Sequence, residues 1–294
     1  MIDRANNRAK GIIFILISAF FYGSYGIWSR IMSSAFDEFS QAWTRGLILI
    51  LVTLLINLKF KIFRPIKRQD LPWFIIIALA GGLNQAPYFF GFKYLNIGTA
   101  TLLFYAALVI GGFLIGKLAF KEQLSTVKIF SLILAIIGIG VVYKLTLRPD
   151  QFLAAALTIT AGLMGACSAV LPKKLSGQYE ELQIMSGYFI VMVVANSILA
   201  LVVNDSLPRL NQLSVWGAQL GYATAMLLAN WSVIEGFKHI EASVGSLVGL
   251  AEILFGISFG IILFGEVLSA GTLFGSGLII ISVILPNLVT HKNG

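Results

Sequence analysis

Apolar stretches of about 20 residues recur from one end of this sequence to the other, separated by short polar turns. An α-helix rises about 1.5 Å per residue, so about 20 apolar residues cross a hydrocarbon core of about 30 Å. Only 12% of the 294 residues are charged, against roughly 25% in an ordinary soluble domain. The sequence therefore predicts an all-α integral membrane protein.

We expect ten transmembrane helices in a single membrane domain over residues 1–294, because the gaps between apolar stretches are short and contain no low-complexity linker. The first stretch follows three basic residues, as a secretory signal peptide would, but its apolar run is longer and it carries bulky aromatic residues where a cleavage site needs small ones. We therefore count it as a span. The predicted spans are 11–31, 40–58, 72–91, 98–119, 126–145, 151–171, 182–203, 213–236, 243–264 and 270–289.

The distribution of basic residues predicts the orientation. With a cytoplasmic amino terminus, the inside segments hold 15 of the 21 Lys and Arg residues and the outside segments hold 5, while Arg45 lies within a span. Cytoplasmic loops collect Lys and Arg, so both termini are expected in the cytoplasm. This bias also explains the net charge of +8 without a nucleic acid partner. We expect a multi-pass protein of the inner (plasma) membrane, in contact with lipids.

Two halves of the sequence match each other. Gly-Phe-Lys at 91–93 recurs at 236–238, and six residues around 112–125 recur around 256–269 at an offset one residue shorter. The implied repeats, 11–145 and 151–289, hold five helices each, and an odd number makes the second copy inverted. Inverted repeats are typical of carriers that bind substrate near the bilayer midplane. Chance matches in glycine-rich apolar sequence are the alternative.

Residues 91–100 (Gly-Phe-Lys-Tyr-Leu-Asn-Ile-Gly-Thr-Ala) and 263–269 (Leu-Phe-Gly-Glu-Val-Leu-Ser) resemble the drug/metabolite transporter superfamily, specifically its EamA-type members. The resemblance covers the whole chain and includes Arg45 and Glu252. It implies an inner-membrane carrier of amino acids, amines, nucleobases, sugars or drugs, with a central cavity lined by both repeats. Two departures weaken any inference about substrate: Ile253 stands where members often have proline, and the second repeat lacks a counterpart of Arg45.

Glu252 is the strongest candidate site residue, because a charge in the middle of an apolar span costs roughly 3 kcal/mol even on lenient insertion scales. It could pair with a substrate ammonium group or take up a proton, which makes the proton a candidate coupling ion. The alternative is an acid that hydrogen-bonds neighbouring helices together. Arg45 could extend toward the lipid headgroups, bridge to a carbonyl or an acid inside the bundle, or bind a substrate carboxylate.

Polar and aromatic residues within other spans are further candidates. In the first span, Tyr22, Tyr25 and Trp28 form an aromatic stripe that could hold a cation or a flat ligand, or could simply pack. In the third span, Pro87 predicts a broken helix, with either a binding site or a simple kink as its reason. The full set of candidate substrate-binding residues is Tyr22, Tyr25, Trp28, Asn84, Gln85, Tyr88, Thr101, Tyr105, Asn230, Trp231, Ser246 and Glu252.

The first hypothesis is a secondary transporter that exports amino acids or related amines by alternating access. The second is a carrier of nucleobases or other flat heterocycles, and a third, of another class, is a membrane-embedded enzyme or a lipid-handling scaffold. The sequence shows no catalytic cluster and no metal or cofactor motif. Substrate, direction, coupling ion and oligomeric state stay open at this point.

Overall fold

The computed structural model describes residues 2–32, 35–207 and 211–290, and in this part of the chain the regular structure is helical, without β-strands. The helices are α1 (Ile2–Gly23), α2 (Tyr25–Met32), α3 (Glu38–Phe60), α4 (Leu71–Leu83), α5 (Gln85–Tyr94), α6 (Ile97–Phe120), α7 (Thr126–Val142), η1 (Pro149–Gln151), α8 (Phe152–Val170), η2 (Leu171–Lys174), α9 (Glu181–Val203), α10 (Leu213–His239), α11 (Ala242–Gly249), α12 (Ala251–Phe264) and α13 (Ala270–Thr290).

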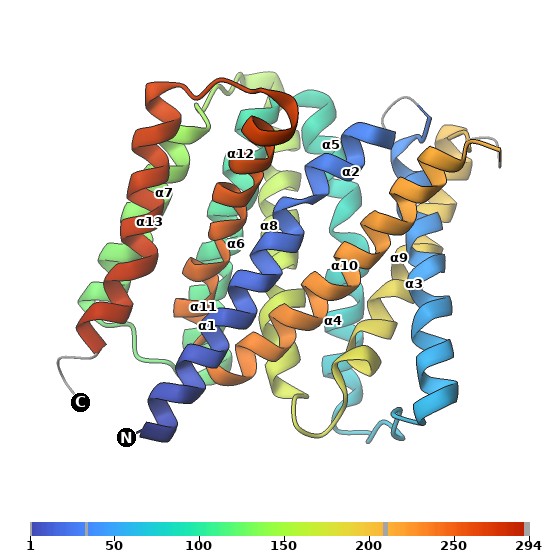
Figure 1. The fold of residues 1–294 in the computed structure, drawn as a ribbon, viewed down its shortest axis with the longest axis horizontal. Coiled ribbons are helices and arrows are strands. Elements are labelled where there is room, and N and C mark those ends of the chain that lie inside the picture. Colours follow the sequence, from blue (N-terminus) through green and yellow to red (C-terminus); the bar gives the residue numbers. More distant parts are fainter. Residues whose placement is uncertain (1, 33–34, 208–210, 291–294) are drawn as a thin grey trace.

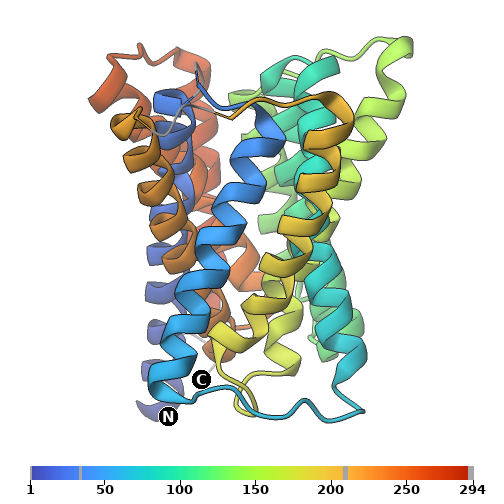
Figure 2. The same ribbon diagram turned by 90° about the vertical axis from the view of Figure 1, so that its right-hand side faces the viewer.

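The helices form one bundle, and α1 begins at the same end of it where α13 ends (Figure 1). We call this end, with the turns 61–70, 121–125 and 240–241, the N-terminal end, and the end with the turns 95–96 and 265–269 the distal end. The turn 61–70 crosses the N-terminal end from α3 to α4 (Figure 2).

Helices from distant parts of the chain pack along each other, notably α1 with α10, α3 with α9 and α7 with α13. Glycine permits the closest of these contacts, because a Cβ atom added at Gly275 would lie 2.7 Å from the carbonyl oxygen of Gly138. Small residues let backbones approach where lipid provides no hydrophobic drive for helix association. Gly275 thus packs against α7 of the same chain.

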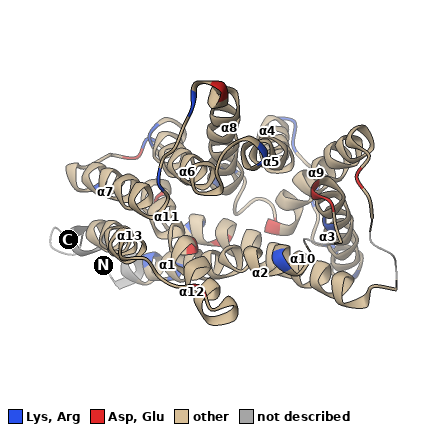
Figure 3. Ribbon diagram, turned by 90° about the horizontal axis from the view of Figure 1, so that it is seen from above, with Lys and Arg blue, Asp and Glu red and all other residues tan. Residues whose placement is uncertain are grey.

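The outer surface of the bundle is apolar, with the Leu118, Leu201 and Ile262 side chains 77%, 79% and 76% exposed. Charged residues are sparse along the helices (Figure 3). Two shorter apolar helices, Thr126–Val142 and Ala270–Pro286, accompany seven segments in the described chain that are long and apolar enough to cross a membrane. These are Asn6–Met32, Glu38–Phe60, Leu71–Tyr94, Ile97–Phe120, Pro149–Lys174, Glu181–Val203 and Ala242–Phe264.

Three of the apolar segments are broken in their interior. The break at Asn84, between α4 and α5, confirms the interruption that Pro87 predicts. The breaks at Ser24, between α1 and α2, and at Leu250, between α11 and α12, were not predicted, because neither position is followed by proline. Ser24 compensates locally, since its hydroxyl donates to the Phe21 carbonyl oxygen at 2.6 Å.

Candidate functional site

A cavity of about 480 Å³ lies inside the bundle, where it is bordered by α1, α2, α4, α5, α6, α8, α9, α10, α11 and α12. All three helix breaks adjoin it, because Gly23 and Tyr25, Asn84 and Gln85, and Leu250 are among its lining residues. Pockets of this size commonly hold small-molecule ligands. The breaks therefore place irregular backbone where it borders a cavity rather than lipid.

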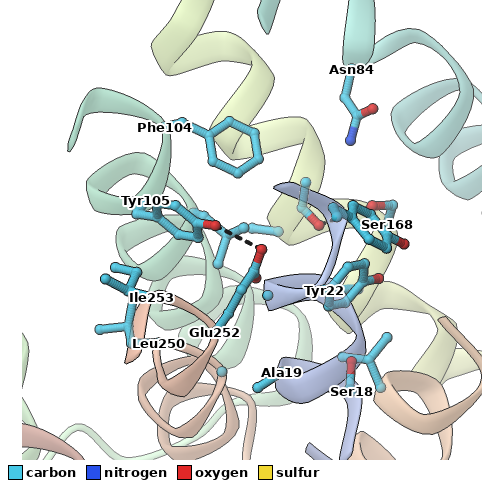
Figure 4. Close-up of a pocket in the computed structure, with 18 of the residues that line it drawn as sticks. Ser18, Ala19, Tyr22, Asn84, Phe104, Tyr105, Ser168, Leu250, Glu252 and Ile253 are labelled. Carbon is cyan, nitrogen blue, oxygen red and sulfur yellow. Dashed lines mark hydrogen bonds between the residues drawn. The ribbon is translucent and has the colours of Figure 1, made fainter. Parts of the chain in front are cut away.

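Glu252, in the first turn of α12, faces this cavity and is the only Asp, Glu, Lys, Arg or His side chain among the described lining residues. The Tyr105 hydroxyl, from α6, donates a hydrogen bond to Glu252 Oε1 at 2.7 Å. Figure 4 shows this contact, with Tyr22, Asn84 and Ser168 on the other side of the pocket. In the described part of the chain no cation forms an ion pair with Glu252, so its carboxylate is available to a cationic ligand.

A second polar contact fixes the wall formed by α1 and α10. The Tyr22 hydroxyl donates to Asn230 Oδ1 at 2.7 Å, and Asn230 Nδ2 donates to the Met226 carbonyl oxygen at 2.7 Å. Buried amide and phenol groups need such partners. This wall is therefore held in one geometry, and Tyr22 presents its ring to the cavity.

Aromatic rings make up much of the remaining lining. Tyr88 stacks on Phe104 with ring centroids 4.2 Å apart and an interplanar angle of 22°, and Tyr25 lies 4.5 Å from the ring of Tyr222. The Tyr25 hydroxyl, which is buried, has no hydrogen-bond partner in the described structure, and the same is true of Tyr188. The cavity thus combines aromatic faces with one carboxylate and with hydroxyls that are free to bind a ligand.

Ten of the twelve predicted site residues line the cavity: Tyr22, Tyr25, Asn84, Gln85, Tyr88, Thr101, Tyr105, Asn230, Ser246 and Glu252. Trp28 and Trp231 do not. The break at Ser24 interrupts the predicted aromatic stripe, and Trp28 instead donates from Nε1 to Ser24 Oγ at 3.2 Å. Trp231 packs edge-to-face on Phe14, at 5.6 Å between ring centroids.

Arg45 does not extend toward the headgroups, because its side chain is 0% exposed. Its guanidinium carbon lies 3.9 Å over the ring of Tyr222, and Nη1 donates to Gln41 Oε1 at 3.4 Å. The Arg45 side chain thus lies inside the bundle, where it contacts the ring of Tyr222 from α10 and Gln41 of its own helix rather than an acid. Sequence reasoning missed Tyr222 and Tyr188, which line the cavity from apolar helices and carry no local signal that distinguishes them from the other aromatic residues.

Comparison with known proteins decides the family. The model of the EamA-like transporter family matches residues 9–144 and again residues 152–288. The chain belongs to the EamA-like transporter family. It is therefore a multi-pass membrane protein of a transporter family rather than of an enzyme family, and the predicted resemblance is confirmed.

Individual relatives are distant. Pseudopaline exporter CntI of Pseudomonas aeruginosa, found in strains PAO1 and UCBPP-PA14, is 21% identical over 221 residues, which cover 74% of this EamA-like chain and 76% of the relative. A crystal structure of a protein 12% identical in sequence superimposes with a TM-score of 0.82, covering 97% of this chain and 98% of the other. At this identity the structural match shows the shared fold alone.

Proposed function

We propose that this EamA-like protein exports small amine-bearing metabolites, amino acids or related amines, by alternating access. The observation that carries the proposal is Glu252, the single charged side chain among the described lining residues, enclosed by tyrosine rings. A carboxylate held in an apolar bundle gains most from a ligand that brings a positive charge. Export is favoured because the curated relative is named an exporter.

The transport mechanism rests on a proposed architecture of ten membrane crossings in two inverted repeats, 11–145 and 151–289, with both termini cytoplasmic. Helices α7, α10 and α13 would supply the three crossings beyond the seven segments of sufficient length and apolarity. The two separate family matches, 9–144 and 152–288, support the repeats. The excess of Lys and Arg at the N-terminal end supports the orientation.

In the proposed binding mode the substrate ammonium group lies against Glu252, and the rings of Tyr22 and Tyr88 contact its cationic and apolar parts. An amino acid also brings a carboxylate. The unpartnered hydroxyls of Tyr25 and Tyr188 suit that group, and the Arg45 charge lies behind the Tyr222 ring that forms part of the same wall. Exchange of the ammonium group for a proton on Glu252 would couple export to a proton gradient.

A thermal-shift series in detergent tests this assignment with three probes that share a phenyl ring. Phenylalanine carries an ammonium and a carboxylate group, 2-phenylethylamine carries only the ammonium group, and 3-phenylpropanoate carries only the carboxylate. We expect both amines to stabilise the wild-type protein, by about 2.7 kcal/mol at a hundredfold excess over Kd, and the amine-free acid to do so weakly. Glu252→Gln should abolish stabilisation by both amines. Arg45→Met should reduce the stabilisation by phenylalanine toward that by 2-phenylethylamine. Stabilisation by neither amine would contradict the proposal.

Flat heterocycles such as nucleobases are the second candidate, favoured by the stacked pair of Tyr88 and Phe104 at the cavity wall. The aromatic part of the predicted site is smaller in the structure, since Trp28 and Trp231 do not line the cavity. Adenine in the same thermal-shift series separates the two candidates. Stabilisation by adenine that survives Glu252→Gln, with none by the amines, would favour the heterocycle carrier.

A further inference from the structure

We propose that Glu122 and Glu266 are paired positioning residues of the transport cycle. Each glutamate closes the cavity at one end of the bundle by capping a helix, while the other glutamate is released from the helix that it caps. In the present structure Glu122 holds the N-terminal end closed by capping α11. In the opposite state Glu266 would hold the distal end closed by capping α6. This inference rests on the alternating access of the proposed function but not on the identity of the substrate.

The two glutamates occupy equivalent turns. Glu122 follows α6 and Glu266 follows α12, and each comes directly after a residue with positive φ, namely Lys121 (φ 55°) and Gly265 (φ 67°). The N–H of Glu122 donates to the Gly116 carbonyl oxygen at 2.9 Å, and that of Glu266 to the Gly260 carbonyl oxygen at 3.2 Å. The chain therefore turns in the same way after both helices.

Each carboxylate also folds back over the glycine that accepts its N–H. A Cβ atom added at Gly116 would lie 2.6 Å from Glu122 Oε2, and one added at Gly260 would lie 2.5 Å from Glu266 Oε2. Only a residue without a side chain leaves room for the carboxylate there. The sequence match between the repeats thus extends to the placement of the two acids.

Glu122 is engaged with the other repeat. Its Oε1 accepts the N–H of Ala242 at 2.6 Å, and its Oε2 accepts the N–H and the hydroxyl of Ser243 at 3.1 and 2.9 Å. Its side chain is 6% exposed, with Lys173 Nζ 4.0 Å away. Hydrogen bonds from a helix N-terminus to a carboxylate are charge-assisted and favoured by the helix dipole. Glu122 therefore fastens the start of α11 to the end of α6.

Glu266 has no such engagement in the described structure. Its side chain is 59% exposed and forms a surface ion pair with Arg30 at 3.1 Å. Residues 91–101 align with 236–246, so the positions equivalent to Ala242 and Ser243 are Ile97 and Gly98, at the start of α6. Ile97 is 71% exposed, whereas Ala242 is 0% exposed. Asn96, the residue before α6, makes no side-chain capping hydrogen bond, and Thr99 in the first turn is buried and bonded to Thr146. In the described structure no carboxylate therefore caps the start of α6.

The cavity lining has the same asymmetry. Its lining residues toward the N-terminal end are buried, with Val170, Phe237 and Ser246 only 1%, 2% and 4% exposed, whereas Gly26, in α2 at the distal end, is exposed. Both capped helices border the cavity, α11 through Ser246 and α6 through Tyr105. In an inverted repeat, a movement that closes one end opens the other. Capping of α11 and capping of α6 are thus alternative states.

Hydrogen–deuterium exchange of the full-length protein in detergent, without substrate, tests the pair. In the wild-type protein the amides of 242–245 exchange through the state in which Glu122 is released. Glu266→Gln, which alters an exposed side chain, should destabilise that state and slow exchange at 242–245 by about tenfold, as expected for one charged hydrogen bond. Glu122→Gln should accelerate exchange at 242–245 and slow it at 97–100.

The control is Glu180→Gln, because Glu180 is an exposed acid at the N-terminal end that makes no capping hydrogen bond, and it should change neither segment. Unchanged exchange at 242–245 in Glu266→Gln would overturn the proposal, because a purely local role cannot reach the other end of the bundle. If Glu122→Gln does not fold, Glu266→Gln alone decides. Failure of the amine probes leaves this result unaffected, so the two proposals fail separately.

Discussion

The Tyr105 hydroxyl and the Glu252 carboxylate, 147 positions apart in the chain, are joined by a hydrogen bond of 2.7 Å at the wall of the central cavity. The contact brings α6 and α12, which belong to different proposed repeats, to one point of the site. It orients the only charged group among the described lining residues. The predictions for the site follow from this pair.

Tyr105→Phe removes the hydroxyl that orients Glu252 but keeps the ring. Hydrogen bonds to charged groups contribute about 1.5–3 kcal/mol to the stability of the structure that forms them, so the melting temperature without ligand should fall. Because the carboxylate is then no longer held in one orientation, affinity for 2-phenylethylamine should also fall. Titration calorimetry in detergent measures this. Tyr94→Phe is the matched control, because Tyr94 is 49% exposed and does not line the cavity. Equal affinities in both variants would show that Tyr105 does not support the binding geometry.

Gly162→Ala tests the close approach of α8 to α6. The added Cβ would overlap the Phe104 carbonyl oxygen and lie 2.8 Å from the Ala107 Cβ, so the helices must separate. We expect a loss of about 1–3 kcal/mol and a lower melting temperature in detergent. Gly217→Ala, with no atom within 4 Å of the added Cβ, should instead stabilise α10 by up to about 1 kcal/mol. Similar melting temperatures for the two variants would refute the packing argument.

Asp37→Asn tests the distal turn between α2 and α3. Asp37 Oδ2 accepts the N–H of Ser206 at 2.7 Å and its hydroxyl at 2.8 Å, and these hydrogen bonds lower the pKa of Asp37 below its ordinary value. A carboxyl group with a lowered folded pKa stabilises the fold above its unfolded pKa of about 4, and this contribution is lost as the pH falls through the folded value.

The melting temperature of the wild-type protein should therefore decrease between about pH 5 and pH 3 more steeply than that of Asp37→Asn. Thermal unfolding followed at several pH values in one detergent measures the difference. Glu180→Gln serves as a control for the loss of one exposed carboxylate. Parallel pH profiles for the wild type and Asp37→Asn would mean that the Ser206 contact does not contribute to stability.

The sequence was informative about helices and about residues whose chemistry conflicts with a membrane span. Glu252 and Asn84 could be found because a carboxylate or an amide in an apolar helix needs a special environment. The break at Asn84 could be found because Pro87 cannot donate a backbone hydrogen bond. These features depend on local chemistry, which a single sequence contains.

Features that depend on contacts between distant segments could not be predicted. The break at Leu250 has no proline, and Trp28 was placed in the site by extending a helical stripe across the unpredicted break at Ser24. The burial of Arg45 depends on the ring of Tyr222, which comes from a helix far along the chain. Tyr222 itself is one aromatic residue among many, and only the fold turns it toward the cavity.

The central claim is that Glu252 binds the cationic group of the transported metabolite. Counterflow of labelled 2-phenylethylamine in sealed proteoliposomes tests it most directly, with wild type, Glu252→Gln and the control Glu180→Gln compared at equal protein density. Loss of one partner of a buried charge pair costs about 2–5 kcal/mol, so Glu252→Gln should reduce counterflow by about thirtyfold or more while Glu180→Gln matches the wild type. Counterflow by Glu252→Gln at the wild-type rate would contradict the account.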